Sequence, residues 1–207
     1  MDVVPSRSLL VRGARLLRRA LDWAHSTRRI LVYRIEFDPT TSTALPADDH
    51  GIRFELDAPI REAGTNVPPT LRAMVAYIQP ELRVHVLRDG SAIIGWGMSG
   101  RPARAWPITE TGTLLHVVAG ECVLAAFEVV TAFRGQGLYK RMLTELLRLH
   151  ATEGDTAAWI WCYEDNLPSR KAIERLQFVH VQTHEQRRRF GKAQSEVHDV
   201  RGSAGGT

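Results

Sequence analysis

The sequence has few cysteines and no long apolar run. Cys122 and Cys162 are the only cysteines among 207 residues, and each lies inside an apolar stretch. We therefore expect two buried free thiols in a reducing compartment, without a disulfide framework. No run of roughly 18 apolar residues occurs, so no transmembrane helix is predicted. The first residues lack a long apolar core followed by a small-residue cleavage site, so we expect no signal peptide and a cytoplasmic protein.

Metal-ligand spacing is also missing from the sequence. The eight histidines show no regular spacing with cysteine or carboxylate residues, and His180 and His184 lie in a segment with strand composition. We therefore predict no metal site. The net charge of +4 and the pI of about 9.4 are only mildly basic. This charge is compatible with a polyanionic cofactor, and we expect no nucleic-acid partner.

The length and the hydrophobic content of 44% predict one globular domain with appendages. We assign residues 29–190 to this domain, residues 1–28 to an N-terminal amphipathic basic helix and residues 191–207 to a disordered tail. Residues 101–112 read as a loop. Two segments, 178–183 and 186–190, are expected to form a final hairpin.

Residues 6–24 place leucines on one side of a helix and five arginines on the other. Such a helix can lie in a membrane interface, with its arginines toward anionic lipid. It can equally dock its apolar side on the domain and leave the arginines in solvent. We expect the docked arrangement, and peripheral membrane contact is the alternative.

The most informative stretch runs from Cys122 to His150. Residues 122–130 have the composition of a buried strand, and leucines recur at helical spacing after Gly137. Between them stand Arg134 and Gly135. A glycine turn that opens a helix presents unpaired backbone N–H groups and a positive dipole end, which suit a phosphate. The loop lacks the Gly-Lys-Ser/Thr of a P-loop and the third glycine of a dinucleotide fingerprint, so a structural turn without ligand stays an alternative.

The segment VVTAFRGQGLYKRML resembles the acetyl-CoA loop of the GNAT superfamily of N-acetyltransferases. Arg134 and Gly137 match the family pattern Arg/Gln-x-x-Gly-x-Gly/Ala, while Tyr139 stands where the family usually has Gly or Ala. Further along, Asn166 and Ser169 match a helix start of the same family. The resemblance implies a mixed α/β (α+β) fold: a mostly antiparallel central sheet flanked by helices, with acyl-CoA in a cleft of the sheet.

The resemblance also implies which residues hold the cofactor and which react. The strand residues Phe127, Val129 and Val130 would hold the pantetheine arm. The pyrophosphate would contact the loop and the helix start, formed by Arg134, Gly135, Gln136, Gly137, Leu138, Tyr139 and Lys140. Asn166 and Ser169 would contact the cofactor arm or the thiol region.

Candidate acid and base residues remain open. Glu121 lies thirteen residues before Arg134, the offset of the glutamate base in some GNAT histone acetyltransferases, but it also suits a turn. Glu128 would be a buried charge unless it faces a cleft. The tyrosine that many members carry seven residues after the asparagine is Ile173 here. Tyr163 is therefore the candidate acid, with Tyr139 as a further option.

The leading hypothesis is an enzyme that transfers acetyl from acetyl-CoA to a primary amine by direct attack in a ternary complex. The acceptor is left open among amino sugars, sugar nucleotides, small amines and protein N-termini. A homodimer is a further open alternative for the assembly of the protein. The Gly-Leu-Tyr loop and the arginine-rich N-terminus resemble exopolysaccharide-associated members of the superfamily. The alternative is a non-catalytic module of the same fold that binds acyl-CoA as a sensor or regulator.

Overall fold

The computed structural model describes residues 25–37, 51–58, 67–75 and 82–200. The predicted helix at residues 6–24 lies outside these ranges, so its docking stays a prediction. Within the described ranges, no helix is long and apolar enough to cross a membrane.

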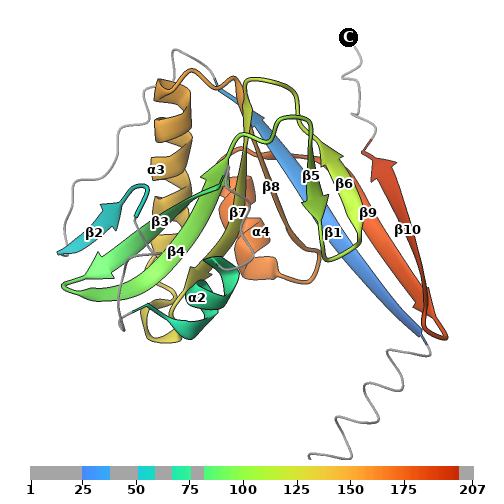
Figure 1. The fold of residues 1–207 in the computed structure, drawn as a ribbon, viewed down its shortest axis with the longest axis horizontal. Helices are drawn as coiled ribbons and strands as arrows, with labels where there is room; N and C mark the ends of the chain where they lie inside the picture. The colour runs from blue at the N-terminus through green and yellow to red at the C-terminus, as the bar shows by residue number, and fades with distance from the viewer. Residues whose placement is uncertain (1–24, 38–50, 59–66, 76–81, 201–207) are drawn as a thin grey trace, which may run out of the picture.

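An eight-stranded sheet forms the body of the described structure, in the order β10-β9-β1-β8-β7-β4-β3-β2 (Figure 1). Its strands are β1 (His25–Glu36), β2 (Ile52–Glu55), β3 (Leu82–Asp89), β4 (Ala92–Gly100), β7 (Glu121–Val129), β8 (Ala157–Tyr163), β9 (Val179–Arg189) and β10 (Lys192–Asp199). Neighbouring strands are antiparallel except for β7 and β8, which are parallel. This confirms the mixed, mostly antiparallel sheet that the sequence predicts.

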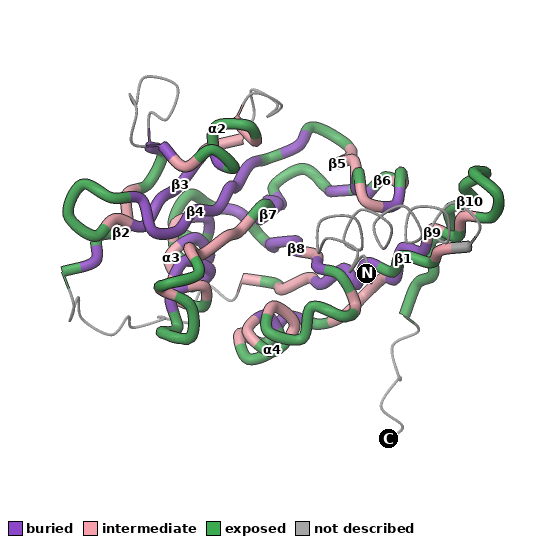
Figure 2. The backbone as a smooth tube through the Cα atoms, turned by 90° about the horizontal axis from the view of Figure 1, so that it is seen from below, coloured by how far each residue is buried: buried purple, intermediate pink, exposed green. Residues whose placement is uncertain are grey.

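Helices and a small hairpin cover the two faces of the sheet. The α3 helix (Leu138–Thr152) and the α4 helix (Leu167–Arg175) lie on one face, which we call the α3 face (Figure 2). The short α2 helix (Pro69–Val75) and the hairpin of β5 (Ala105–Ile108) and β6 (Thr113–His116) lie on the other, which we call the α2 face. A 3₁₀ turn, η1 (Thr131–Phe133), joins β7 to the loop before α3.

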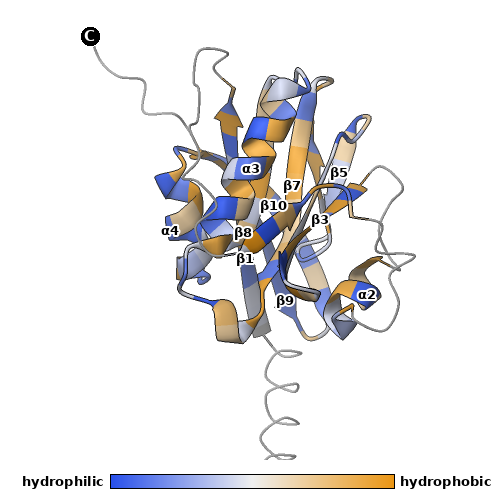
Figure 3. Cartoon of the chain, turned by 90° about the vertical axis from the view of Figure 1, so that its left-hand side faces the viewer, coloured by the Kyte–Doolittle hydropathy of each residue, from blue (hydrophilic) through white to orange (hydrophobic). Residues whose placement is uncertain are grey.

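Successive side chains of β7 point to opposite faces of the sheet and pack into the hydrophobic core on each face. Cys122 and Leu124 pack toward α3, where Leu143 lies in the same cluster. Val123 points to the opposite face and packs with Trp159 of β8 and with the β5–β6 hairpin. The α3 helix buries leucines on the side that faces the sheet and carries hydrophilic residues elsewhere (Figure 3). A strand buried on both faces therefore runs through the centre of the domain, as its composition indicates.

Two sequence predictions about the later strands are wrong. Residues 192–199 were expected in a disordered tail, but they form β10, which is exposed along its whole length (Figure 2). This strand carries no apolar pattern that could predict it, because backbone pairing to β9 stabilises it. Phe190 and Gly191, both with positive φ, form the two-residue turn between the strands. Residues 178–190 consequently hold one continuous strand, β9, and not a hairpin.

The remaining differences lie in the β5–β6 hairpin, at β3 and at β1. Residues 105–108, expected in a loop, form β5, whose Trp106 and Ile108 are buried in the core of the α2 face. The strand β3 has no counterpart in the sequence-based interpretation. The first strand begins at His25, four residues before the predicted start of the domain.

A buried histidine of β3, His85, faces Ser99 of the neighbouring strand β4. The backbone N–H of Asp57 donates to Nδ1 of His85 over 3.2 Å, so Nε2 carries the ring proton and donates to Ser99 Oγ over 2.8 Å. Burial, together with the nearby charge of Arg83, lowers the pKa of His85 from 6.5 to about 3. The ring is therefore neutral in the folded protein at neutral pH.

We predict that the free energy of unfolding falls as the pH is lowered from 7 to 5. The unfolded chain binds a proton at this histidine below pH 6.5, whereas the folded chain does not bind it until about pH 3. The loss approaches about 1.4 kcal/mol per pH unit for one proton. His150 and His184, whose pKa values are also lowered by burial, act in the same direction. Urea denaturation of His85→Gln should therefore show a shallower pH dependence than the wild type; equal slopes would contradict the assignment.

Candidate functional site

The two parallel strands at the centre of the sheet part midway along their length. Pairing between β7 and β8 runs from Glu121–Ala157 to Leu124–Ile160 and then stops. Beyond that point β7 continues along β4 as far as Val129, while β8 continues along β1 as far as Tyr163. The sheet therefore opens between the second halves of these strands.

A bulge in β7 marks the point of separation. Ala126 has a φ of 58°, and the register with β4 shifts between Trp96 and Met98. Gly97 lies opposite the bulge, where a Cβ would come within 2.3 Å of the Phe127 ring. The glycine admits this ring on the α3 face, and the extra residue brings both Ala125 and Ala126 to the cavity on the α2 face.

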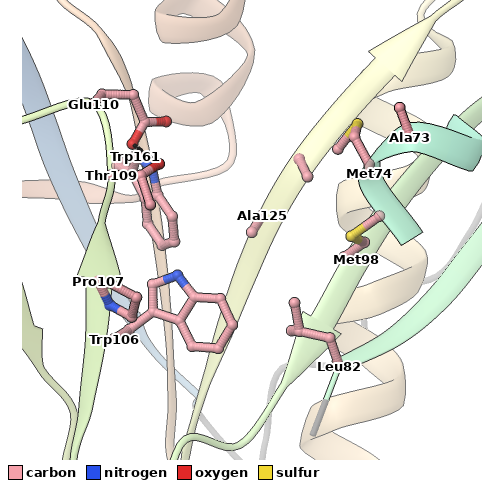
Figure 4. A pocket seen from close by; sticks show the side chains of 11 residues that line it. Ala73, Met74, Leu82, Met98, Trp106, Pro107, Thr109, Glu110, Ala125 and Trp161 are labelled. Atoms are coloured by element: carbon pink, nitrogen blue, oxygen red, sulfur yellow. Dashed lines mark hydrogen bonds between the residues drawn. The ribbon is translucent and has the colours of Figure 1, made fainter. Parts of the chain in front are cut away.

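That cavity has a volume of about 540 Å³ and lies between α2, the β5–β6 hairpin and the sheet. Figure 4 shows Trp106 and Trp161 on one side of it, Met74 and Met98 on the other, and Ala125 between them. Its described lining is completed by Ala73, Leu82, Pro107, Thr109, Glu110 and Ala126. The cavity therefore borders the sheet just beyond the last paired residues of β7 and β8.

The glycine loop lies at the other end of the opening, before α3. Gly135 and Gly137 have φ values of 81° and 76°, and a Cβ at either would meet no atom within 4 Å. Gly137 is the N-cap and no side chain caps the first turn, which contains no acidic residue. Arg134 is exposed and donates from Nε to the carbonyl of Val129 over 2.9 Å. These features form an open, electropositive helix start that fits an anion.

Residues of the α3 face link this helix start to α4. The Tyr139 hydroxyl lies 2.9 Å from Ser169 Oγ, and its ring meets Phe127 edge-on at 5.5 Å. Burial raises the pKa of Tyr139 to about 12. The larger side chain at position 139 therefore bridges α3 to the first turn of α4. Asn166 caps that turn by accepting from the Ser169 N–H over 3.3 Å.

The remaining predicted cofactor residues have different surroundings. Val129 packs on the α3 face, and Val130 packs on the α2 face against the Trp96 cluster. The Leu138 side chain is buried in the core under the helix start. Gln136 and Lys140 are exposed beside the loop, where their side chains are accessible to a ligand.

Glu121 is fully engaged by its neighbours. Arg34 Nη2 and Trp159 Nε1 each donate to its carboxylate over 2.6 Å, and the Val118 N–H donates over 3.3 Å. Burial opposes the charged form, but these donors outweigh it and lower the pKa of Glu121. The side chain does not line the cavity. This arrangement suits an anchor for the start of β7 better than a proton acceptor.

Glu128 and Tyr163 lie nearer to the opening. Glu128 pairs with Trp96 across the β4–β7 ladder and so shares the α2 face with it. Tyr163 follows Trp161 by two residues on β8, and the residue is 40% exposed. Burial raises the pKa of Tyr163, and the charge of Glu110 adds to this effect. The strand end therefore carries a protonated phenol close to the Glu110 carboxylate.

One buried cluster has the composition of a metal site. The ligand atoms of Cys122, His150 and Asp155 lie within 4.8 Å of one another. However, His150 Nδ1 is 2.6 Å from Asp155 Oδ2, and Arg101 donates to the other carboxylate oxygen over 2.7 Å. Both oxygens are thus engaged in hydrogen bonds, and the cluster ties the end of α3 to the sheet.

Sequence reasoning missed the cavity lining. Glu110 and Trp106 belong to the segment 101–112, which the sequence indicates as a loop, and Trp161 belongs to an apolar segment. Neither segment carries a local chemical motif. Trp106 was the sequence feature that could have indicated the cavity. A large aromatic side chain in a predicted loop is usually covered by a core or by a ligand.

Solved structures show the same fold at low sequence identity. A GCN5-related N-acetyltransferase from Sphaerobacter thermophilus matches with a TM-score of 0.55 and 17% identity, covering 86% of this chain and 56% of its own. A Drosophila protein matches with a TM-score of 0.52 and 11% identity, covering 87% and 58%. A GCN5-related glucosamine N-acetyltransferase region of a fungal multi-domain β-N-acetylglucosaminidase matches at 0.50 and 14%, covering 88% and 23%. The chain thus spans just over half the length of the first two proteins.

A search of curated protein sequences finds no match to the chain. The family model "Acetyltransferase (GNAT) family" matches residues 54–178, which include β7, the glycine loop, α3 and α4. With this match over more than half of its length, and with the parted strands and open glycine loop in place, the chain belongs to the GNAT acetyltransferase family.

Proposed function

We propose that the protein transfers an acetyl group from acetyl-CoA to a primary amine by direct attack in a ternary complex. The observation that carries this proposal is the opening between β7 and β8, with the electropositive glycine loop before α3 at one end and the cavity at Ala125 and Ala126 at the other. A phosphorylated donor and an amine acceptor can therefore approach the same bulge from opposite sides of the sheet.

Several residues have surroundings that suit the donor. The uncapped N–H groups of the α3 start, together with Arg134, suit the pyrophosphate. The backbone of residues 127–129, which does not pair with β8, suits the pantetheine arm. When bound, acetyl-CoA supplies the activated thioester. The amine nitrogen bonds to the acetyl carbon as the C–S bond breaks, and the proton that the nitrogen loses balances the one that the thiolate gains.

Glu128 and Tyr163 lie on the second halves of β7 and β8, which do not pair with each other, and they are our candidates for proton transfer. We propose Glu128 as the group that takes the amine proton and Tyr163 as the group that protonates the thiolate. A phenol with a raised pKa keeps its proton at neutral pH and can donate it. Glu121 is the weaker base candidate, because Arg34 and Trp159 already occupy its carboxylate.

A non-catalytic acyl-CoA-binding module is the second candidate. Ile173, fully buried in the core of the α3 face, occupies the position of the family's usual tyrosine. Incubation with acetyl-CoA and a panel of amines, while free thiol is measured, separates the two functions. Thiol release that depends on the amine supports the transferase, whereas tight binding without release supports the module.

Replacing Gly137 by Val should weaken acetyl-CoA binding at least tenfold in calorimetric titration, a cost of about 1.4 kcal/mol. The new side chain would occupy the space through which the phosphates approach. Gly154→Val is the matched control, because Gly154 follows the other end of α3, also has positive φ and also has open space at its Cβ. Equal affinities of the two folded variants would refute the assignment of the loop.

Glu121→Gln and Glu128→Gln should fail in different ways. Glu121→Gln should lower the free energy of unfolding by about 1–3 kcal/mol, because an amide N–H₂ would face the donors of Arg34 or Trp159. Glu36→Gln, which changes the exposed partner of Arg34, is its control and should cost little.

Glu128→Gln should keep the stability but reduce the rate roughly 100-fold and remove the rising acid limb of the pH–rate profile. An unchanged rate in Glu128→Gln, with a lost acid limb in Glu121→Gln, would reverse the two roles.

A further inference from the structure

The cavity on the α2 face is predominantly apolar. Its walls are the indoles of Trp106 and Trp161 on one side and the thioethers of Met74 and Met98 on the other (Figure 4). A volume of about 540 Å³ lies within the range of sites that enclose a small molecule. An apolar or aromatic ligand is stabilised when such walls cover it, because apolar surface is removed from water. The methionine side chains can adapt to the shape of the ligand.

Glu110 is the one charged side chain among the described residues of the lining. It is half-buried in the β5–β6 turn, and the described residues give its carboxylate one hydrogen bond, from the Thr109 hydroxyl over 3.3 Å. Thr111, the next residue, is held in place because its carbonyl accepts from Gln186 over 2.9 Å. The turn that carries Glu110 is therefore anchored to β9, and its carboxylate lines the same cavity as the two indoles, where a single cation is stabilised by charge and by the ring faces.

This composition discriminates among amine acceptors. A sugar nucleotide needs cations for its phosphates, and the described lining contains no lysine or arginine. A polyamine carries further charges that would lie unpaired against the methionines. An amino sugar needs partners for several hydroxyl groups, whereas Thr109 and Glu110 are the described non-aromatic side chains that offer hydrogen bonds.

We propose that the acceptor is a primary amine with a compact aromatic or apolar body, whose ammonium group binds Glu110 and whose body lies between the tryptophans and the methionines. This inference rests on the proposed acetyl transfer, because it identifies the class of amine that is acetylated. Glu110 acts as a substrate-binding residue, and Trp161 acts as a specificity-determining residue.

The test uses the full chain with acetyl-CoA and three amines: 2-phenylethylamine, glucosamine and spermidine. We expect kcat/KM for 2-phenylethylamine to exceed the other two values at least 100-fold. Glu110→Gln should raise the KM for 2-phenylethylamine at least tenfold and leave the KM for acetyl-CoA unchanged. Trp161→Ala should reduce the discrimination against glucosamine at least tenfold, and Trp161→Phe should restore most of it. Glu36→Gln, an exposed carboxylate outside the cavity, is the matched control for the loss of a charge.

The outcomes separate this inference from the proposed function. If glucosamine or spermidine is acetylated best, the inference is overturned and acetyl transfer stands. If acetyl-CoA does not bind at all, the proposed function fails, and calorimetry with 2-phenylethylamine alone decides the inference. Binding that is lost in Glu110→Gln supports the cavity assignment, and the absence of binding overturns it. Thermal melting of each variant identifies a change in folding.

Discussion

The architecture depends on where backbone pairing between β7 and β8 ends. The two parallel strands are joined from Glu121 to Leu124, and each then follows a different antiparallel partner. The Arg34–Glu121–Trp159 contacts bind β1, β7 and β8 together at the closed end. Because three strands are fixed there, the other ends can diverge without loss of the core. The opening is thus a property of the sheet and not of a mobile loop.

The two faces of this opening differ in chemistry. The α3 face presents a glycine loop and an uncapped helix start, which favour phosphate, and Tyr139 joins that start to α4. The α2 face presents an apolar cavity with one carboxylate among its described residues. The bulge at Ala126 lies between them and turns two successive alanines toward the cavity. Small side chains at this point leave room for a reacting group, which fits the proposed meeting of thioester and amine.

The sequence predicted what local patterns determine. The strand at residues 122–130, the helix after Gly137 and the helix start at Asn166 were correct, because hydrophobic periodicity and the motifs of helix starts act over a few residues. The prediction failed where long-range pairing decides: β10 has no apolar pattern and depends on β9. The cavity was missed for the same reason, since Trp106, Trp161 and Met74 come from three distant segments. The partners of Glu121 could not be predicted from the local sequence either, because Arg34 lies 87 residues away along the chain.

The most direct test of the account is a crystal structure of the protein with coenzyme A. The account predicts that the pyrophosphate contacts the backbone of residues 135–140 and that the pantetheine arm passes between β7 and β8, with its sulfur near Ala126. A structure in which coenzyme A binds outside this opening, or in which β7 and β8 pair as far as Val129, would contradict it.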